Sequence, residues 1–85
     1  MSPENNIQLT VVVSGQPVPL KVNVHQSLEH LVHEALQNSG NKGQTPSEWE
    51  LRLDGRLLDQ GMTVAAAGLT AGATLFLSPR AGAGG

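Results

Sequence analysis

The sequence predicts an α+β fold in which one helix packs across a mixed sheet of four to five strands. Two observations carry this prediction. Apolar and polar residues alternate in four segments of the 85-residue chain, as expected of strands that are buried on one face. Between the second and the third of these segments, the apolar spacing changes to the period of a helix.

Residues 7–13 and 18–24 are predicted to pair as a hairpin. One face of each strand is apolar, formed by Ile7, Leu9, Val11 and Val13 in the first strand and by Val18, Leu20, Val22 and Val24 in the second. The Ser14-Gly15-Gln16-Pro17 segment between them has the chemistry of a turn. Because Pro19 has no N–H to give to a neighbouring strand, the second strand is predicted at an edge of the sheet.

Residues 27–39 are predicted to form the helix. Its apolar stripe consists of Leu28, Leu31, Val32, Ala35 and Leu36. Ser27 occupies the N-cap position, and Glu29 places a negative charge in the first turn. The Asn38-Ser39-Gly40 segment is a stop signal, and a loop is expected over 41–48.

The second half of the chain is predicted to complete the sheet. A strand is expected at 49–53, and Asp54-Gly55 is a strong signal for a two-residue hairpin turn into a short strand near 56–58. Residues 59–72 are rich in alanine, glycine and threonine, with Leu69 as the expected core anchor. The last strand is expected over 73–78, with inward Leu75 and Leu77 and outward Thr74 and Phe76.

These elements place one domain at 7–78, between a disordered arm of residues 1–6 and a flexible tail of residues 79–85. The five Lys and Arg residues and seven Asp and Glu residues give a net charge of -2, without the basic stripe of a nucleic-acid binder. The absence of cysteine excludes a disulfide, a thiolate nucleophile and a thiolate metal site. No apolar run reaches the length of a membrane span, and the first residues lack the pattern of a signal peptide. A cytoplasmic monomer without nucleic-acid or membrane partners is therefore expected.

The order of elements resembles that of ubiquitin and the other β-grasp modifiers over residues 7–85. Segments 27–30, 54–59 and 68–75 carry this resemblance, because they are similar to the family's helix start, hairpin and closing strand. Residues 41–51 and 74–85 are more similar to the bacterial ubiquitin-like proteins called multiubiquitin. Those proteins are encoded together with an activating enzyme, a conjugating enzyme and a metalloprotease.

The resemblance implies a protein modifier that is not itself an enzyme. An E1-like enzyme would use ATP to adenylate the carboxylate of Gly85, and an E2-like enzyme would receive the chain as a thioester and pass it to target proteins. A metalloprotease would remove it, and a role in antiviral defence is implied by analogy. No cofactor is expected on the chain itself.

The residues of the tail fit this chemistry. Gly84 has no Cβ and can enter a narrow channel beside the reacting Gly85, and Gly82 adds a further flexible point. Arg80 is the charged residue of the tail, expected to dock on an acidic groove of an activating enzyme. A glycine-rich end that is merely frayed is the alternative, and the preceding β-grasp pattern favours the functional interpretation.

Phe76 is expected on the outer face of the sheet, together with Val12, Thr74 and Arg52. An exposed aromatic residue beside a valine and charged residues is typical of a docking surface. Single exposed apolar residues are also common, so both interpretations stay open. Arg52 occupies the position of the central isoleucine of ubiquitin's own binding surface, so the usual readers of ubiquitin are expected to bind poorly.

Other polar residues are assigned to the surface. His30 and His33 have a spacing on the helix that a metal could use, with His25 upstream, but a solvated helix face is favoured because structural zinc needs four ligands. No metal site is therefore expected. Lys42 and, less favourably, Lys21 are candidate acceptors for a further copy of the chain, although both are also explained as solubilising charges.

Two alternatives to the modifier remain. A sulfur carrier shares the β-grasp fold, the two terminal glycines and the adenylation step, and its carboxylate becomes a thiocarboxylate. A non-covalent interaction module would use the Phe76 face and would not need the tail.

Overall fold

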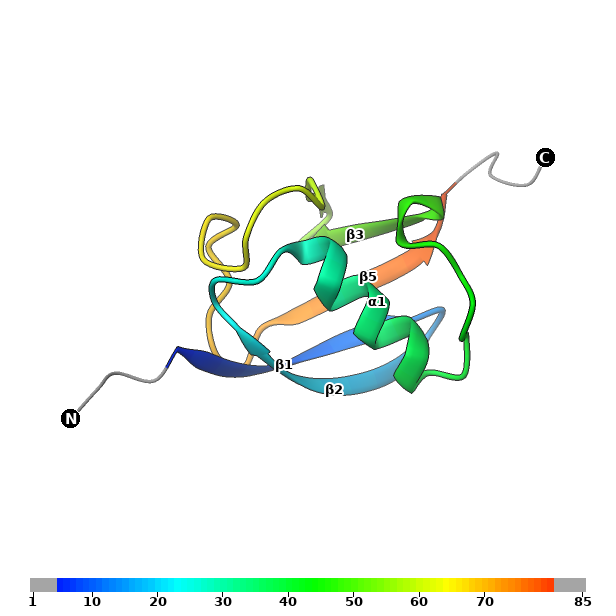
Figure 1. Ribbon diagram of the computed structural model, residues 1–85, viewed down its shortest axis with the longest axis horizontal. Coiled ribbons are helices and arrows are strands. Elements are labelled where there is room, and N and C mark those ends of the chain that lie inside the picture. The colour runs from blue at the N-terminus through cyan, green and yellow to red at the C-terminus, as the bar shows by residue number, and fades with distance from the viewer. Residues whose placement is uncertain (1–4, 81–85) are drawn as a thin grey trace.

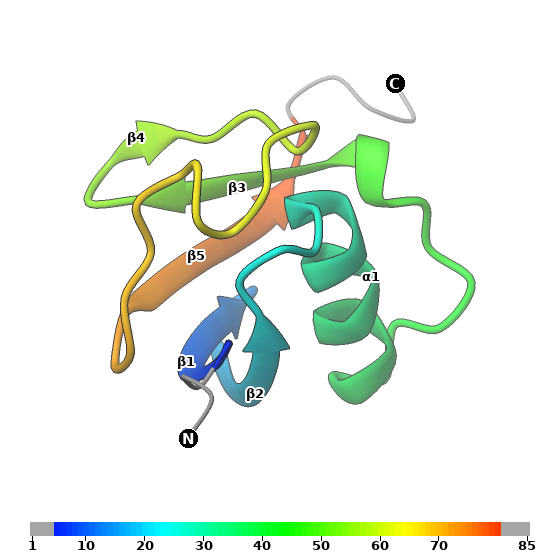
Figure 2. The same ribbon diagram turned by 60° about the vertical axis from the view of Figure 1, so that its left-hand side comes forward.

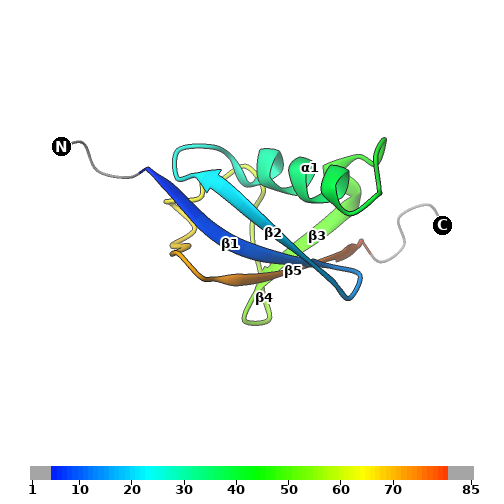
Figure 3. The same ribbon diagram turned by 90° about the horizontal axis from the view of Figure 1, so that it is seen from below.

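The computed structural model describes residues 5–80 as a five-stranded mixed sheet with one helix across one of its faces (Figure 1). The elements are β1 (Asn6–Val13), β2 (Gln16–Asn23), α1 (Leu28–Asn38), the short 3-10 helix η1 (Pro46–Glu48), β3 (Trp49–Leu53), β4 (Arg56–Leu57) and β5 (Thr74–Pro79). The strand order is β2-β1-β5-β3-β4, with β1 and β5 parallel and all other pairs antiparallel. The predicted fold class is confirmed, and Figure 3 shows α1 on one side of the sheet only.

Both hairpins turn on two residues with positive φ. These are Ser14 and Gly15 between β1 and β2, and Asp54 and Gly55 between β3 and β4. Such turns match the right-handed twist of the strands on either side. The first turn is shorter than the four residues predicted, because Gln16 already pairs with Val13 in the sheet.

Replacement of Gly55 by alanine should reduce the free energy of unfolding by about 1 kcal/mol, because φ is 81° at this position and a side chain is strained there. No atom lies within 4 Å of the Cβ that would be added, so the backbone alone sets the cost. Urea unfolding measures the change. Gly61→Ala is the control, since the φ of Gly61 is ordinary and its added Cβ meets only the Asp59 side chain. An equal loss at Gly61 would contradict the backbone explanation.

Strand β2 lies at an edge of the sheet, as Pro19 predicted. The backbone N–H of Asn23 points away from β1, because it donates to Oε1 of Gln26 at 3.2 Å. Since N–H directions alternate along a strand, positions 17, 19 and 21 face the open edge as well. Pro17 and Pro19 have no N–H, so along β2 this edge offers a free donor only at Lys21. This arrangement disfavours the addition of a further strand to β2.

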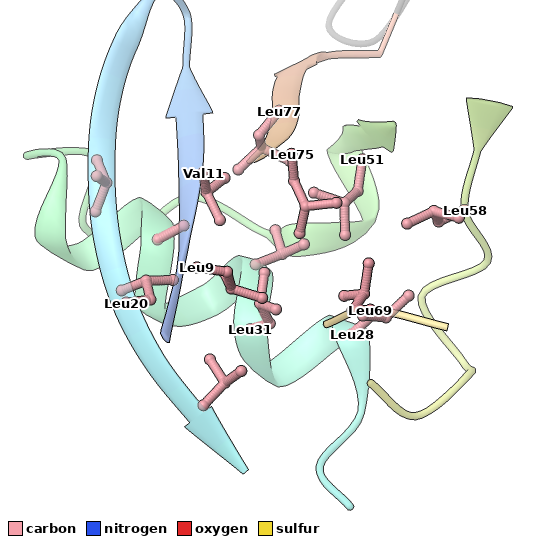
Figure 4. Close-up of a cluster of buried hydrophobic side chains, with 14 of the residues drawn as sticks. Leu9, Val11, Leu20, Leu28, Leu31, Leu51, Leu58, Leu69, Leu75 and Leu77 are labelled. Carbon is pink, nitrogen blue, oxygen red and sulfur yellow. The ribbon is translucent and has the colours of Figure 1, made fainter. Parts of the chain in front are cut away.

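The helix begins and ends close to the predicted residues. Ser27 caps its start, since its Oγ accepts a hydrogen bond from the backbone N–H of His30 at 3.2 Å. The five predicted stripe residues of α1 are all buried and face the sheet. Figure 4 shows the resulting core, in which Leu31 of the helix lies beside Leu9 of β1 and Leu28 lies beside Leu69.

The segment between β4 and β5 closes one end of the core. Leu69 is buried as predicted, and Val64, which the sequence analysis did not identify, is completely buried. Backbone bonds hold this segment against the chain before α1: Val64 N–H donates to the carbonyl of Gln26 and Ala65 N–H to that of Val24, both at 2.9 Å. The segment therefore belongs to the folded body despite having almost no regular structure.

The folded body extends slightly beyond the predicted range 7–78. Asn6 is the first residue of β1, and the carbonyl of Asn5 accepts a bond from Val24 at 2.7 Å. At the other end, Pro79 still belongs to β5, where it pairs with Trp49. Strand β1 thus starts one residue before the predicted range, and β5 ends one residue after it. Within residues 5–80, no helix is long and apolar enough to cross a membrane.

Candidate functional site

Arg80 marks the point where the described chain leaves the sheet. Its backbone N–H donates to the carbonyl of Glu48 at 2.8 Å, and its Nε donates to the carbonyl of Ser47 at 3.1 Å. Both acceptors belong to η1, so the side chain predicted to dock on a partner is bonded to the chain's own body. Gly82, Gly84 and Gly85, which carry the rest of the tail prediction, lie outside the described residues.

Gln60 holds η1 from the opposite side. Its Nε2 donates to the carbonyls of Pro46 at 3.0 Å and of Trp49 at 2.9 Å, which are the first residue of η1 and the residue that follows η1. The carbonyl of Gln60 accepts the N–H of Glu29 at 3.0 Å, which attaches the same residue to the start of α1. In Figure 2 the chain leaves β4 and passes along β3 toward α1, which brings Gln60 to this position. Gln60 therefore holds the residues on either side of Ser47 and Glu48, whose carbonyls bond Arg80.

Replacement of Gln60 by alanine should reduce the free energy of unfolding by about 1–3 kcal/mol, because the Trp49 carbonyl loses the Gln60 donor and the Pro46 carbonyl keeps only the N–H of Trp49. It should also speed hydrogen exchange at the Arg80 amide, whose acceptor lies in η1. Urea unfolding and amide exchange measure the two effects. Gln37→Ala, on the exposed face of α1, is the control and should change neither. If the Arg80 amide exchanged at the same rate in Gln60→Ala, the proposed link would be wrong.

The outer face of the sheet carries a row of side chains that we call the Phe76 row. Phe76 pairs with Val12 on one side and with Arg52 on the other, so the register places these three predicted residues side by side. The row continues to Leu57, which pairs with Arg52. Phe76 and Leu57 are each 54% exposed, the largest exposures among the large apolar residues of the described chain.

The remaining residues of this face modify the row. The guanidinium of Arg52 lies 2.9 Å from the carboxylate of Glu50, so its charge is partly neutralised. Thr74, the fourth predicted residue, pairs with Thr10 two positions before Phe76 and lies beside the row. The sequence does not predict Leu57 as part of this face, because β4 has only two residues and alternation cannot be recognised in so short a strand. The register of β3 against β4 identifies its face.

The surface lysines and histidines lie apart from the two sites above. Lys21 on β2 and Lys42 in the loop before η1 are both exposed, and their role as acceptors stays a prediction. Nε2 of His30 lies 3.8 Å from the carboxylate of Glu34, one helical turn along α1. Among residues 5–80, no three His, Asp or Glu side chains lie close enough together to hold a metal ion.

Comparison with known proteins places the chain in a family and identifies its fold. The family described as "Protein of Unknown function (DUF2604)" matches residues 2–85. An uncharacterized protein, y4jI, of Sinorhizobium fredii is 38% identical over 80 residues, which cover 93% of this chain and 62% of that protein. The chain therefore spans less than two thirds of the length of this relative.

The solved structures that resemble the chain are ubiquitin-like. A designed protein based on ubiquitin is 20% identical with a TM-score of 0.82, covering 98% of this chain and 99% of the design. The ubiquitin of Caldiarchaeum subterraneum is 19% identical with a TM-score of 0.74, over 88% and 94% of the two chains. A chain from work on molecular mimicry of SUMO in DNA repair is 16% identical with a TM-score of 0.79, over 89% and 94%. The chain thus belongs to the DUF2604 family and has the ubiquitin-like β-grasp fold.

Proposed function

We propose that the chain is a ubiquitin-like protein modifier that is joined to target proteins through the carboxylate of Gly85. The ubiquitin-like fold supports a modifier or an interaction module. The observation that favours the modifier is the way in which the chain is fixed just before the tail. Strand β5 and the two hydrogen bonds of Arg80 hold the chain against the folded body, five residues before Gly85. Five extended residues reach about 17 Å, enough to bring a carboxylate to an enzyme that contacts the body.

The chemistry needs activation because a free carboxylate has no good leaving group. In the proposed sequence, a carboxylate oxygen of Gly85 attacks the α-phosphorus of ATP, pyrophosphate leaves, and an acyl-adenylate forms. A cysteine thiolate of the activating enzyme then displaces AMP to give a thioester, which passes by exchange to a conjugating enzyme. Finally a target amine attacks the thioester carbonyl and releases the thiol. All catalytic groups in this sequence belong to the partner enzymes.

The resemblance to the multiubiquitin proteins extends this proposal to the partners. An E1-like enzyme, an E2-like enzyme and a deconjugating metalloprotease of bacterial origin would act on the chain, and the conjugates would serve in antiviral defence. The sulfur carrier is the closest alternative, because it needs the same adenylate and differs in the nucleophile that follows.

One experiment separates these functions. The full chain is incubated with ATP, Mg²⁺ and purified candidate activating and conjugating enzymes from the same genome, and intact masses are recorded. The modifier predicts an adduct with a target that has lost one water, and release of AMP and pyrophosphate. Replacement of one oxygen by sulfur would identify a carrier instead. Binding of the chain to a partner without any ATP-dependent mass change would overturn both.

The interaction module is the second candidate, and the Phe76 row favours it. Phe76 and Leu57 expose more than half of their surface on one face of the sheet, and Val12 of β1 lies beside Phe76. Exposed aromatic and aliphatic side chains of this kind are typical centres of protein interfaces. A module of this kind would keep its function when Gly85 is deleted, which the modifier would not.

A further inference from the structure

A groove of about 500 Å³ lies beside Arg80, between β3 and the segment that follows β4. Its floor is apolar and is formed by the buried Trp49 and Leu58. Trp49 is mostly buried, whereas Leu57 projects at the rim. Because Arg80 also lines the groove, a protein that binds the chain just after this residue would lie next to the groove.

The rim of the groove is acidic. The carboxylates of Glu29, Glu50 and Asp59 line it, against the single guanidinium of Arg80. Glu50 already pairs with Arg52 at 2.9 Å, and Asp59 uses Oδ1 to accept the N–H of Gly61 at 2.8 Å. Within the described chain, Glu29 forms no ion pair. The groove therefore combines an apolar floor with uncompensated negative charge.

We propose that this groove receives an arginine side chain from the partner protein that takes hold of the tail. An arginine has a three-carbon stem that packs on apolar surface and a guanidinium that forms paired bonds with carboxylates. The apolar floor would contact the stem of the arginine, and the carboxylates at the rim would pair with its guanidinium. This inference rests on the proposed function for the identity of the partner, since it is the tail that brings that protein to the groove.

The proposal reverses the sign of the electrostatic contact expected from the sequence. Arg80 was expected to dock on an acidic groove of the activating enzyme. In the structure its Nε bonds to Ser47, and the surroundings of the side chain carry more negative than positive groups. A partner surface that is acidic at this point would be repelled, and a basic one would be attracted.

A peptide titration tests the groove independently of any enzyme. The probes are acetyl-Leu-Arg-Leu-amide and the same peptide with citrulline, which keeps the shape but removes the charge. Trp49 is the only tryptophan of the chain and lines the groove, so its fluorescence reports occupancy. We expect the arginine peptide to shift the fluorescence and to bind about tenfold more tightly than the citrulline peptide. Equal binding of the two peptides, or no effect of either on Trp49, would overturn the proposal.

A pair of charge-matched variants localises the effect. Glu29→Gln with Asp59→Asn removes two rim charges, keeps the side-chain shapes and retains Oδ1 of residue 59 for Gly61. Glu34→Gln with Asp54→Asn changes the net charge equally at residues that do not line the groove. Only the first pair should weaken the arginine peptide, by about tenfold. An equal weakening in both pairs would mean that overall charge, rather than the groove, attracts the peptide.

The same variants connect the groove to the partner. With the activating enzyme, the first pair should raise the KM for the chain about tenfold while kcat stays the same, because a docking contact is lost and the reacting carboxylate is not altered. An unchanged KM, with peptide binding lost, would refute the partner assignment. If the unaltered chain is not activated at all, the proposed function fails, and the peptide titration still decides whether the groove binds arginine.

Discussion

Leu75→Ala is expected to reduce the free energy of unfolding by about 3–5 kcal/mol. Leu75 is completely buried in β5, and Figure 4 shows it beside Leu51 in the centre of the core. Strand β5 pairs with both β1 and β3, so the surrounding backbone cannot easily collapse into the space left by the side chain. A domain of 85 residues has a total stability of only about 4–13 kcal/mol.

Urea unfolding measures this loss, and Leu57→Ala is a matched control. The control makes the same chemical change in the same sheet, but Leu57 is 54% exposed and should cost less than about 1 kcal/mol. We expect a fall of about 2–3 M in the urea midpoint for Leu75→Ala with an unchanged slope. Comparable losses in the two variants would contradict the assignment of inner and outer faces on which the site also depends.

The faces of the strands could be predicted from the sequence because alternation leaves little choice. Leu75 and Leu77 point to the helix and Phe76 away from it, as their order requires. The start of β2 could not be predicted, because proline is typical of turns. Pro17 is accepted in the strand since its missing N–H faces the open edge, where no strand needs it.

Contacts between distant segments were beyond the sequence analysis. Val64 lies in an alanine- and glycine-rich segment without periodicity, and its burial is set by backbone bonds to the chain before α1. In the candidate site, Gln60 reaches a carbonyl 14 residues away, and Arg80 reaches one 33 residues away. No sequence pattern near Gln60 or Arg80 indicates these partners. The Phe76 row was predictable in part, because the neighbours on β1 and β3 follow once the strand order is assumed.

Gly84→Val is expected to reduce the rate of ATP-dependent activation at least about 100-fold while the urea midpoint stays the same. A valine adds bulk and restricts the backbone at the position before the reacting carboxylate. An activating enzyme has to align that carboxylate with the α-phosphorus of ATP, and misplacement by about 1 Å is enough for such a loss. Release of pyrophosphate under single-turnover conditions measures this step.

Ala81→Val is the control, because it adds a similar bulk at the residue that follows Arg80. If only Gly84→Val loses activity, the partner enzyme accepts only a slender backbone at the last two residues, as the proposed chemistry requires. Equal losses in both variants would mean that bulk is excluded along the whole tail, and the special role of Gly84 would be withdrawn. Full activity of Gly84→Val would remove the basis for a diglycine modifier and leave the Phe76 row as the functional surface.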